Sequence, residues 1–437
     1  MNRTGVAVAT DSALTVENSG KTITYNGVHK LFRLHAHHNI AILVYGSPTF
    51  MEIPWEIIIR TYRDYHGIRE SLSTASTYAN EFFSFLATFC RKHCKALVEE
   101  HYRNYVLSIV EQIMGELYTS LRTERVSQVE KIIEDKATAD NSFSQLLNRA
   151  LSKLLRTRIN ALKKLRFSEG FSKDTEALLL KQFDAENQQI VRTKLTETAV
   201  DANNANHFSE LVILSITRGN GDNIAASNCE LDTEISSGIV FVGYGKDDIF
   251  PSAWGYDVTG FMLGNVIRHI AHEESITTSH RAALRAFGED EMVRTFMHGI
   301  ADEFKEEFGR RVEERAKAEQ TRPLFERSAY DQIAEDIEAS AECRKLSAIA
   351  DMPRSLLAEL AENMVVLSSI KNRLHDHDTS VGGPISVAVI TKGDGLVWIK
   401  RDNYFDPSLN LHFLDRNAPT HILTSKTPTG IQGGRHG

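Results

Sequence analysis

The sequence contains few cysteines, few prolines and no long apolar run. Four cysteines in 437 residues are too few for a disulfide framework, which is typical of proteins kept in a reducing cytoplasm. Nine prolines exclude collagen-like and Pro-rich disordered chains. The longest apolar stretches, such as 40–45 and 239–242, are far shorter than the ~20 residues of a membrane helix, and no apolar signal segment begins the sequence. We expect a folded cytoplasmic protein that does not enter a membrane.

Neither sign of charge dominates the sequence. There are 50 Lys and Arg residues against 58 Asp and Glu residues, a formal net charge of −8. Because no global basic field attracts the protein to nucleic acid, nucleic-acid binding is disfavoured and would have to be local. The length of the chain predicts more than one domain.

Short apolar or β-branched runs predict strands, and longer stretches with apolar residues every three or four positions predict helices. Four runs in the first 50 residues are interpreted as one meander, and a helix is expected from Pro54. Predicted strands lie at 5–10, 22–25, 29–34, 40–45, 209–216, 238–243, 256–262, 385–391 and 395–400; predicted helices fill 74–200, 264–273 and most of 279–374.

Strands at both ends and in the middle of the chain predict an antiparallel α+β core interrupted by two helical blocks. The expected segments are 1–73, the first half of the core; 74–208, a helical insertion; 209–275, core strands; 276–374, a second helical segment; 375–414, a closing core hairpin; and 415–437, a flexible tail.

Three residues near strand ends are candidates for a catalytic site. Asp11 ends a predicted strand, Lys30 opens another, and Gly46 ends a third before a helix. In a meander these residues would approach one another. A Lys beside an Asp can lower the pKa of a nearby nucleophile, and a Gly N–H before a helix can face an oxyanion. From composition alone an ordinary Asp-Ser turn is the better interpretation.

The strands GVAVATDS, HKLFRL and AILVYG, the last running into a helix, resemble the β-subunits of the proteasome and their bacterial ring-forming relatives. Those proteins are N-terminal nucleophile (Ntn) hydrolases. The segment Ser380–Lys400, in which a Gly-Gly pair leads into two strands, resembles the closing hairpin of the same family. A stretch around 239–262 adds to the resemblance, but the helical blocks have no counterpart.

The resemblance implies a four-layer αββα Ntn-hydrolase sandwich, here with a large helical insertion, that hydrolyses peptide or amide bonds as a homo-oligomer without a cofactor. In that family an N-terminal Thr is the nucleophile and its α-amine is the general base. Asp11 and Lys30 match the aspartate and lysine that assist it, Gly46 matches the oxyanion-hole glycine, and Asp378 matches a supporting aspartate. The serine of that last motif falls on Val381, unless Ser380 replaces it.

The sequence departs from the family at its start. A nucleophile strand and its turn need roughly 12–16 residues before the aspartate, and ten precede Asp11. Thr4 is expected on the same strand as Asp11 and cannot be a free terminus as well. We expect this chain as written to lack the nucleophile and to be inactive, either because the true start lies upstream or because the protein never carries that residue. The alternative is a non-catalytic assembly or partner-binding protein that uses the helical insertion.

Four groups of His, Cys and acidic residues contain metal-ligand types, but none has the spacing of a known zinc motif. We therefore expect no metal. The chain also has no phosphate-binding glycine loop and no Gly-x-Ser-x-Gly elbow, so we expect no cofactor. The four groups are His35–His38, Cys90–Cys94, His269–Glu274 and His375–Asp378.

Residues 141–168 form a basic amphipathic segment, with seven Lys or Arg residues and no acidic one. Its leucines make an apolar stripe. Such a helix can bind a partner helix, a membrane surface or nucleic acid. We expect the leucines to pack inside the protein and the basic face to meet the acidic block at 279–350 or solvent. Binding of a protein partner by the basic face is the alternative. A dimer or small oligomer is expected through helices of 74–200.

Overall fold

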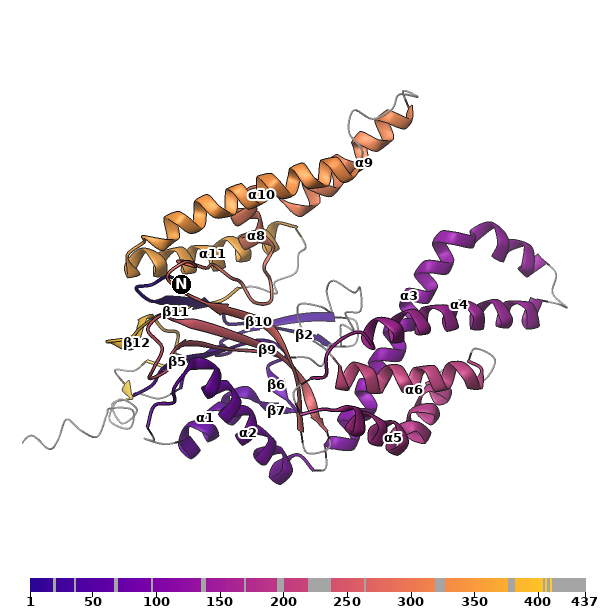
Figure 1. Ribbon diagram of the computed structural model, residues 1–437, viewed down its shortest axis with the longest axis horizontal. Helices are drawn as coiled ribbons and strands as arrows, with labels where there is room; N and C mark the ends of the chain where they lie inside the picture. Colours follow the sequence, from indigo (N-terminus) through magenta and orange to yellow (C-terminus); the bar gives the residue numbers. More distant parts are fainter. Residues whose placement is uncertain are drawn as a thin grey trace, which may run out of the picture.

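The computed structural model describes residues 1–410 except 19–20, 35–36, 67–69, 96, 135–138, 169, 195–199, 219–236, 263–264, 319–326, 376–381, 404 and 407–408. The described chain is a mixed α+β structure with several antiparallel sheets (Figure 1).

The largest sheet has five antiparallel strands. It combines strands from the first 50 residues with strands from the middle of the chain, and its central pairing joins Ile42 to Phe241. The strand order is β10 (Asn265–Ser275), β9 (Ser252–Met262), β8 (Ser237–Tyr244), β5 (Asn39–Gly46) and β4 (Leu31–Arg33).

A second sheet joins the two ends of the chain. Its order is β1 (Val6–Thr10), β11 (Ser386–Thr391) and β12 (Gly395–Lys400), so that Val6 pairs with Ile390. Two small hairpins complete the strands: β2 (Ala13–Asn18) with β3 (Lys21–Asn26), and β6 (Thr49–Phe50) with β7 (Ile53–Pro54). The predicted N-terminal meander is therefore wrong, because β1 pairs with a strand almost 380 positions away and not with its neighbours in sequence.

The two sheets pack face to face over a shared apolar core. Val6 and Ile390 of the small sheet are buried against Ala41 and Val242 of the large one. Helix α2 (Ala75–His93), beside α1 (Trp55–His66), covers the other face of the large sheet at β8 and β9. Helix α11 (Arg354–His375) packs on β1 and β11, with α8 (Glu291–His298) and α10 (Arg327–Ala350) beyond it; α9 (Asp302–Ala318) packs on α10.

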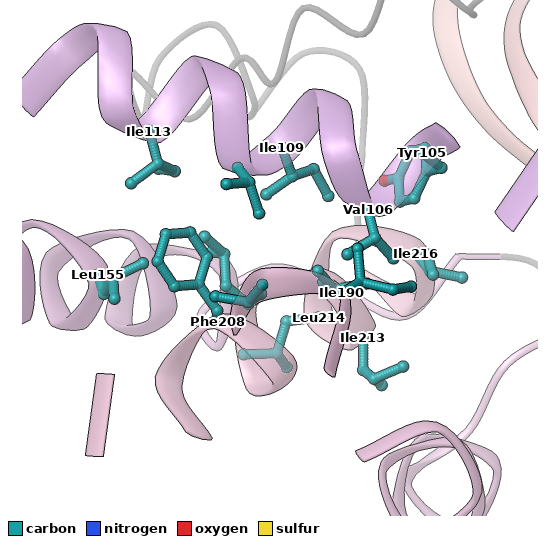
Figure 2. Packing of buried hydrophobic residues seen from close by; sticks show 14 of the residues in the cluster. Tyr105, Val106, Ile109, Ile113, Leu155, Ile190, Phe208, Ile213, Leu214 and Ile216 are labelled. Carbon is teal, nitrogen blue, oxygen red and sulfur yellow. The ribbon is translucent and has the colours of Figure 1, made fainter. Parts of the chain in front are cut away.

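Four further helices form a cluster with a core of their own. They are α3 (Val98–Glu134), α4 (Ala139–Leu162), α5 (Lys173–Lys194) and α6 (Ala202–Thr217). Figure 2 shows side chains from all four, including Ile109, Leu155, Ile190 and Phe208, meeting in one buried core. Met262 and Ile267 of the β9–β10 hairpin join the same core. The cluster is thus attached to the end of the large sheet.

Two predicted elements are of the wrong type. The strand predicted at 209–216 is part of helix α6, which begins at the N-cap Asp201, whose side chain accepts a hydrogen bond from the Asn204 amide. Helix α6 is apolar nearly all round because the other helices surround it, so its sequence resembles a buried strand. The helix predicted at 264–273 is strand β10. Two β-bulges, after Ile267 and after Ile270, break its alternation of apolar and polar residues.

At Gly243 the backbone of β8 lies too close to β5 to leave room for a side chain. The φ of this glycine is +139°, and a Cβ there would lie 2.0 Å from the Asn39 carbonyl oxygen. Because both the backbone conformation and the space exclude a side chain, Gly243→Ala should lower the free energy of unfolding by at least about 2 kcal/mol. Gly115→Ala is the matched control: nothing lies within 4 Å of a Cβ on this residue of α3, and the change should stabilise the protein by about 0.5–1 kcal/mol. Urea unfolding measures both.

Candidate functional site

Asp11 and Lys30 form an ion pair at one end of the two sheets. Asp11 follows β1, and Lys30 directly precedes β4. Lys30 Nζ lies 2.7 Å from Asp11 Oδ1, with the two side chains 23% and 12% exposed. The contact expected from the sequence is therefore present. The ammonium group is held by a mostly buried carboxylate but stays accessible from solvent.

The Asp11 carboxylate is fixed by two backbone amides as well. Its Oδ2 accepts hydrogen bonds from the Ala13 amide at 3.2 Å and from the Gly382 amide at 3.1 Å. Gly382 in turn accepts a bond from the Ser12 amide. The next residue, Gly383, has a φ of +75°, and a Cβ there would come within 2.6 Å of Ser12 Oγ. Glycine at 383 therefore allows this close approach of the chain to Asp11.

Gly46 lies at the same end of the large sheet as Lys30. The Val44 amide donates to the Lys30 carbonyl oxygen at 2.9 Å, and Gly46 ends the same strand two residues later with a φ of +71°. Its proposed role in binding an oxyanion remains a prediction. Asp378, like Ser380 and Val381, lies outside the described residues.

A cavity of about 310 Å³ adjoins the residue before Gly46. Tyr45 lines it together with His272, Arg285 and Phe287. The Tyr45 hydroxyl donates to Asp257 Oδ1 at 3.0 Å, and burial, followed by the Asp257 charge, raises the pKa of Tyr45. The phenol is therefore neutral at physiological pH and acts as a hydrogen-bond donor.

Thr4 is at the far end of β1 from Asp11. It lies in a turn and not on the strand where it was expected, and its Oγ1 donates to Asn2 Oδ1 at 2.8 Å. The five residues of β1 separate it from Asp11 by roughly 17 Å. Thr4 therefore cannot act beside Lys30 in this structure.

The other edge of β1 has no partner strand among the residues that the structure describes. Val6 and Val8 on β1 are nonetheless buried, because α11 covers one face of the strand and the large sheet covers the other. Directly before β1, Asn2 already forms antiparallel bridges with Gly5 and with Ala282. A segment that paired with this edge along all of β1 would have one end close to Asp11 and Lys30.

The predicted ligand motifs form no three-residue metal cluster within the described parts of the chain. Cys90 belongs to α2 and Cys94 caps its C-terminal end, and both are buried in the core between this helix and the large sheet. His269 lies on strand β10, not on a helix, with Nδ1 2.9 Å from Ser168 Oγ. The close group found there instead is His298, Asp302 and Glu338. Glu338 is far in sequence from the other two, and the three residues match no motif.

The basic segment is helix α4 with the turn that follows it. Its buried positions, such as Leu151 and Leu155, face α3 and α6 as expected. Two of its cations pair with acidic residues of those same helices: Arg158 with Glu116, and Lys163 with Glu210. These acidic partners belong to the helical cluster and not to the block at 279–350, which was one of the two expected surroundings; solvent, the other, meets Arg149, Lys153 and Arg156.

No protein-family model, curated protein or solved structure matches this chain. None of the helices in its described residues has the length and apolar character needed to cross a membrane. Since no relative describes the site, its chemistry is read from its own contacts. The Asp11 carboxylate fixes the Lys30 ammonium group beside the edge of β1 that has no partner strand among the described residues.

Removing the Asp11 carboxylate should destabilise the protein, because it leaves the Lys30 ammonium and two amides without their acceptor. We expect Asp11→Ala to cost about 2–4 kcal/mol in urea unfolding and Lys30→Met to cost less. The double variant should cost less than the sum of the two single changes. Arg354→Ala is the control, since its ion pair with Asp394 is more than half exposed and should contribute about 0–1 kcal/mol. Additive losses at 11 and 30 would contradict a coupled pair.

Proposed function

We propose that this chain forms the core of an Ntn hydrolase that cleaves peptide or amide bonds. The ion pair between Lys30 and Asp11, beside the free edge of β1, is the observation that carries the proposal. The order of layers supports it: α2, the five-stranded sheet, the three-stranded sheet and α11 follow one another, as in an αββα sandwich.

Hairpin geometry supports the position of the nucleophile in this proposal. A strand that precedes β1 in a hairpin runs antiparallel to it, so its first residue lies beside the end of β1, next to Asp11. In the family that the sequence resembles, this first residue is Thr. The nucleophile would therefore come from residues ahead of Met1 that pair with the free edge of β1.

Each residue then has a role in acyl transfer. The α-amine of the nucleophile accepts the proton of its hydroxyl, which attacks the substrate carbonyl carbon. The Lys30 ammonium favours the charged form of the nucleophile, and Asp11 keeps Lys30 in position. The Gly46 N–H donates to the oxyanion that forms at the attacked carbonyl.

Protein that starts at Met1 should hydrolyse no peptide or amide substrate, since no residue of β1 brings a free amine to Lys30. Adding an upstream strand that begins with Thr should give turnover, measured by fluorophore release from short peptide amides. In that longer protein, Lys30→Ala should lower kcat at least ~100-fold. Lys173→Ala, an exposed residue of α5, should leave kcat unchanged.

Two results would contradict this assignment. Turnover by the Met1 form that is lost in Thr4→Ala would make Thr4 the nucleophile and the proposed strand alignment wrong. A longer protein whose activity survives Lys30→Ala would remove Lys30 from the reaction.

A second candidate function, binding of an acidic protein partner, is favoured by the exposed face of α4. Arg149, Lys153 and Arg156 are exposed there, at the spacing of one helical stripe. Within the part of the chain that the structure describes, these three side chains form no ion pair, unlike Arg158 and Lys163. The apolar face of α4 is buried in the helical core, so it cannot insert into a bilayer. We propose that the stripe contacts an acidic helix, including one from a second copy in a homo-oligomer.

The stripe is tested with labelled poly-L-glutamate by fluorescence anisotropy at low salt. The triple variant Arg149→Glu, Lys153→Glu, Arg156→Glu should weaken binding about tenfold or more. The control changes three exposed cations of α5, Lys173, Lys181 and Arg192, to Glu and should change binding less than about twofold. Equal losses in the two variants, or tighter binding to duplex DNA or to phosphatidylserine vesicles, would contradict a specific acidic protein partner.

A further inference from the structure

A tight corner between α8 and α9 brings together residues of metal-ligand type. Helix α8 ends at His298, and Gly299 closes it with a φ of +81° and a hydrogen bond to the Thr295 carbonyl oxygen. Helix α9 begins three residues later at Asp302. Glu338, from the middle of α10, faces the same corner. One ligand atom from each of His298, Asp302 and Glu338 lies within 4.8 Å of the other two.

The imidazole supplies an independent sign of a missing partner. His298 Nδ1 has less than 1 Å² of exposed surface and no hydrogen-bond partner among the residues that the structure describes. A buried nitrogen without a partner is unfavourable, and native structures rarely keep one without a function or a bound group.

The two carboxylates already have cationic neighbours, so a bound metal ion must compete with them. Lys305 Nζ lies 3.1 Å from Glu338 Oε1, and Arg294 Nη2 lies 3.4 Å from Asp302 Oδ2. Both cations are long, mobile side chains that can move towards solvent. Within the described residues, neither cation forms an ion pair that involves His298. A metal ion would replace their attraction for the carboxylates and would also bond to an imidazole nitrogen of His298.

We propose that His298, Asp302 and Glu338 bind a divalent transition-metal ion, with Zn²⁺ as the best match. Nitrogen and carboxylate oxygen are ordinary zinc ligands at about 2.0–2.2 Å, whereas Mg²⁺ and Ca²⁺ prefer oxygen alone. Bonds of that length require the three atoms to move somewhat closer together and Lys305 to release Glu338. A fourth position stays open for water.

The metal would fix the base of a projecting helical hairpin. Helices α9 and α10 extend away from the two sheets (Figure 1). Phe304 and Phe308 of α9 are exposed, so burial of apolar surface contributes little to holding α9. An ion that joins Asp302 to Glu338 and to the end of α8 ties α9 to the two helices behind it.

The test is calorimetric titration of the full chain with Zn²⁺, followed by Co²⁺ spectroscopy. We expect one Zn²⁺ per chain and a Co²⁺ spectrum without a thiolate charge-transfer band, which excludes binding at the exposed Cys343. Glu338→Gln and His298→Ala should each weaken binding at least about tenfold. Lys305→Met should strengthen it, because the competing ammonium is gone.

His280→Ala is the matched control, since His280 also contacts a carboxylate, with Nε2 2.7 Å from Glu274. It should leave Zn²⁺ affinity unchanged. Zn²⁺ should raise the melting temperature of the wild type but not of Glu338→Gln, and the melting temperature without metal checks that each variant is folded. Absence of a one-to-one site, equal affinity in His298→Ala and His280→Ala, or weaker binding in Lys305→Met would overturn the proposal.

Discussion

The Asp11 carboxylate connects parts of the chain that no local interaction could hold together. It follows β1 of the small sheet, binds Lys30 at the start of β4 in the large sheet, and accepts the Gly382 amide from the segment that leads into β11. One side chain therefore links both sheets and both ends of the sequence. A partly buried carboxylate is unfavourable unless all of these partners are present, so the ion pair and the pairing of β1 with β11 depend on each other.

This closure explains how the chain carries long helical segments without losing its core. The sheets are completed by β1, β11 and β12 from the two ends of the chain. The segment between β5 and β8 can therefore leave the core, form the α3–α6 cluster and return. That cluster has its own buried interior and joins the sheet through Met262 and Ile267. Its stability comes mainly from helix packing, while the site at Asp11 depends on strand pairing between distant residues.

The sequence predicts well those elements whose pattern is set by one neighbour. Helix α1 and strands β5, β11 and β12 lie where apolar spacing and turn residues indicate. Prediction fails where the surroundings determine the pattern: α6 is enclosed on all sides, and β10 is interrupted by bulges. The approach of Asp11 to Lys30 was expected from an N-terminal meander that does not form, and from the resemblance to a family. The amide of Gly382 and the position of Glu338 depend on long-range packing, which spacing along the chain does not encode.

The free edge of β1 limits the direction from which another segment can reach the ion pair. An exposed strand edge normally carries charges or bulges that prevent pairing, but β1 has the sequence Val-Ala-Val-Ala-Thr and is covered on both faces. Only a segment lying in the plane of the sheet can reach its amides. An antiparallel partner that lies in this plane, precedes β1 and is as long as β1 would begin next to Asp11. The closure that fixes Lys30 therefore places the ion pair at the end of this strand edge.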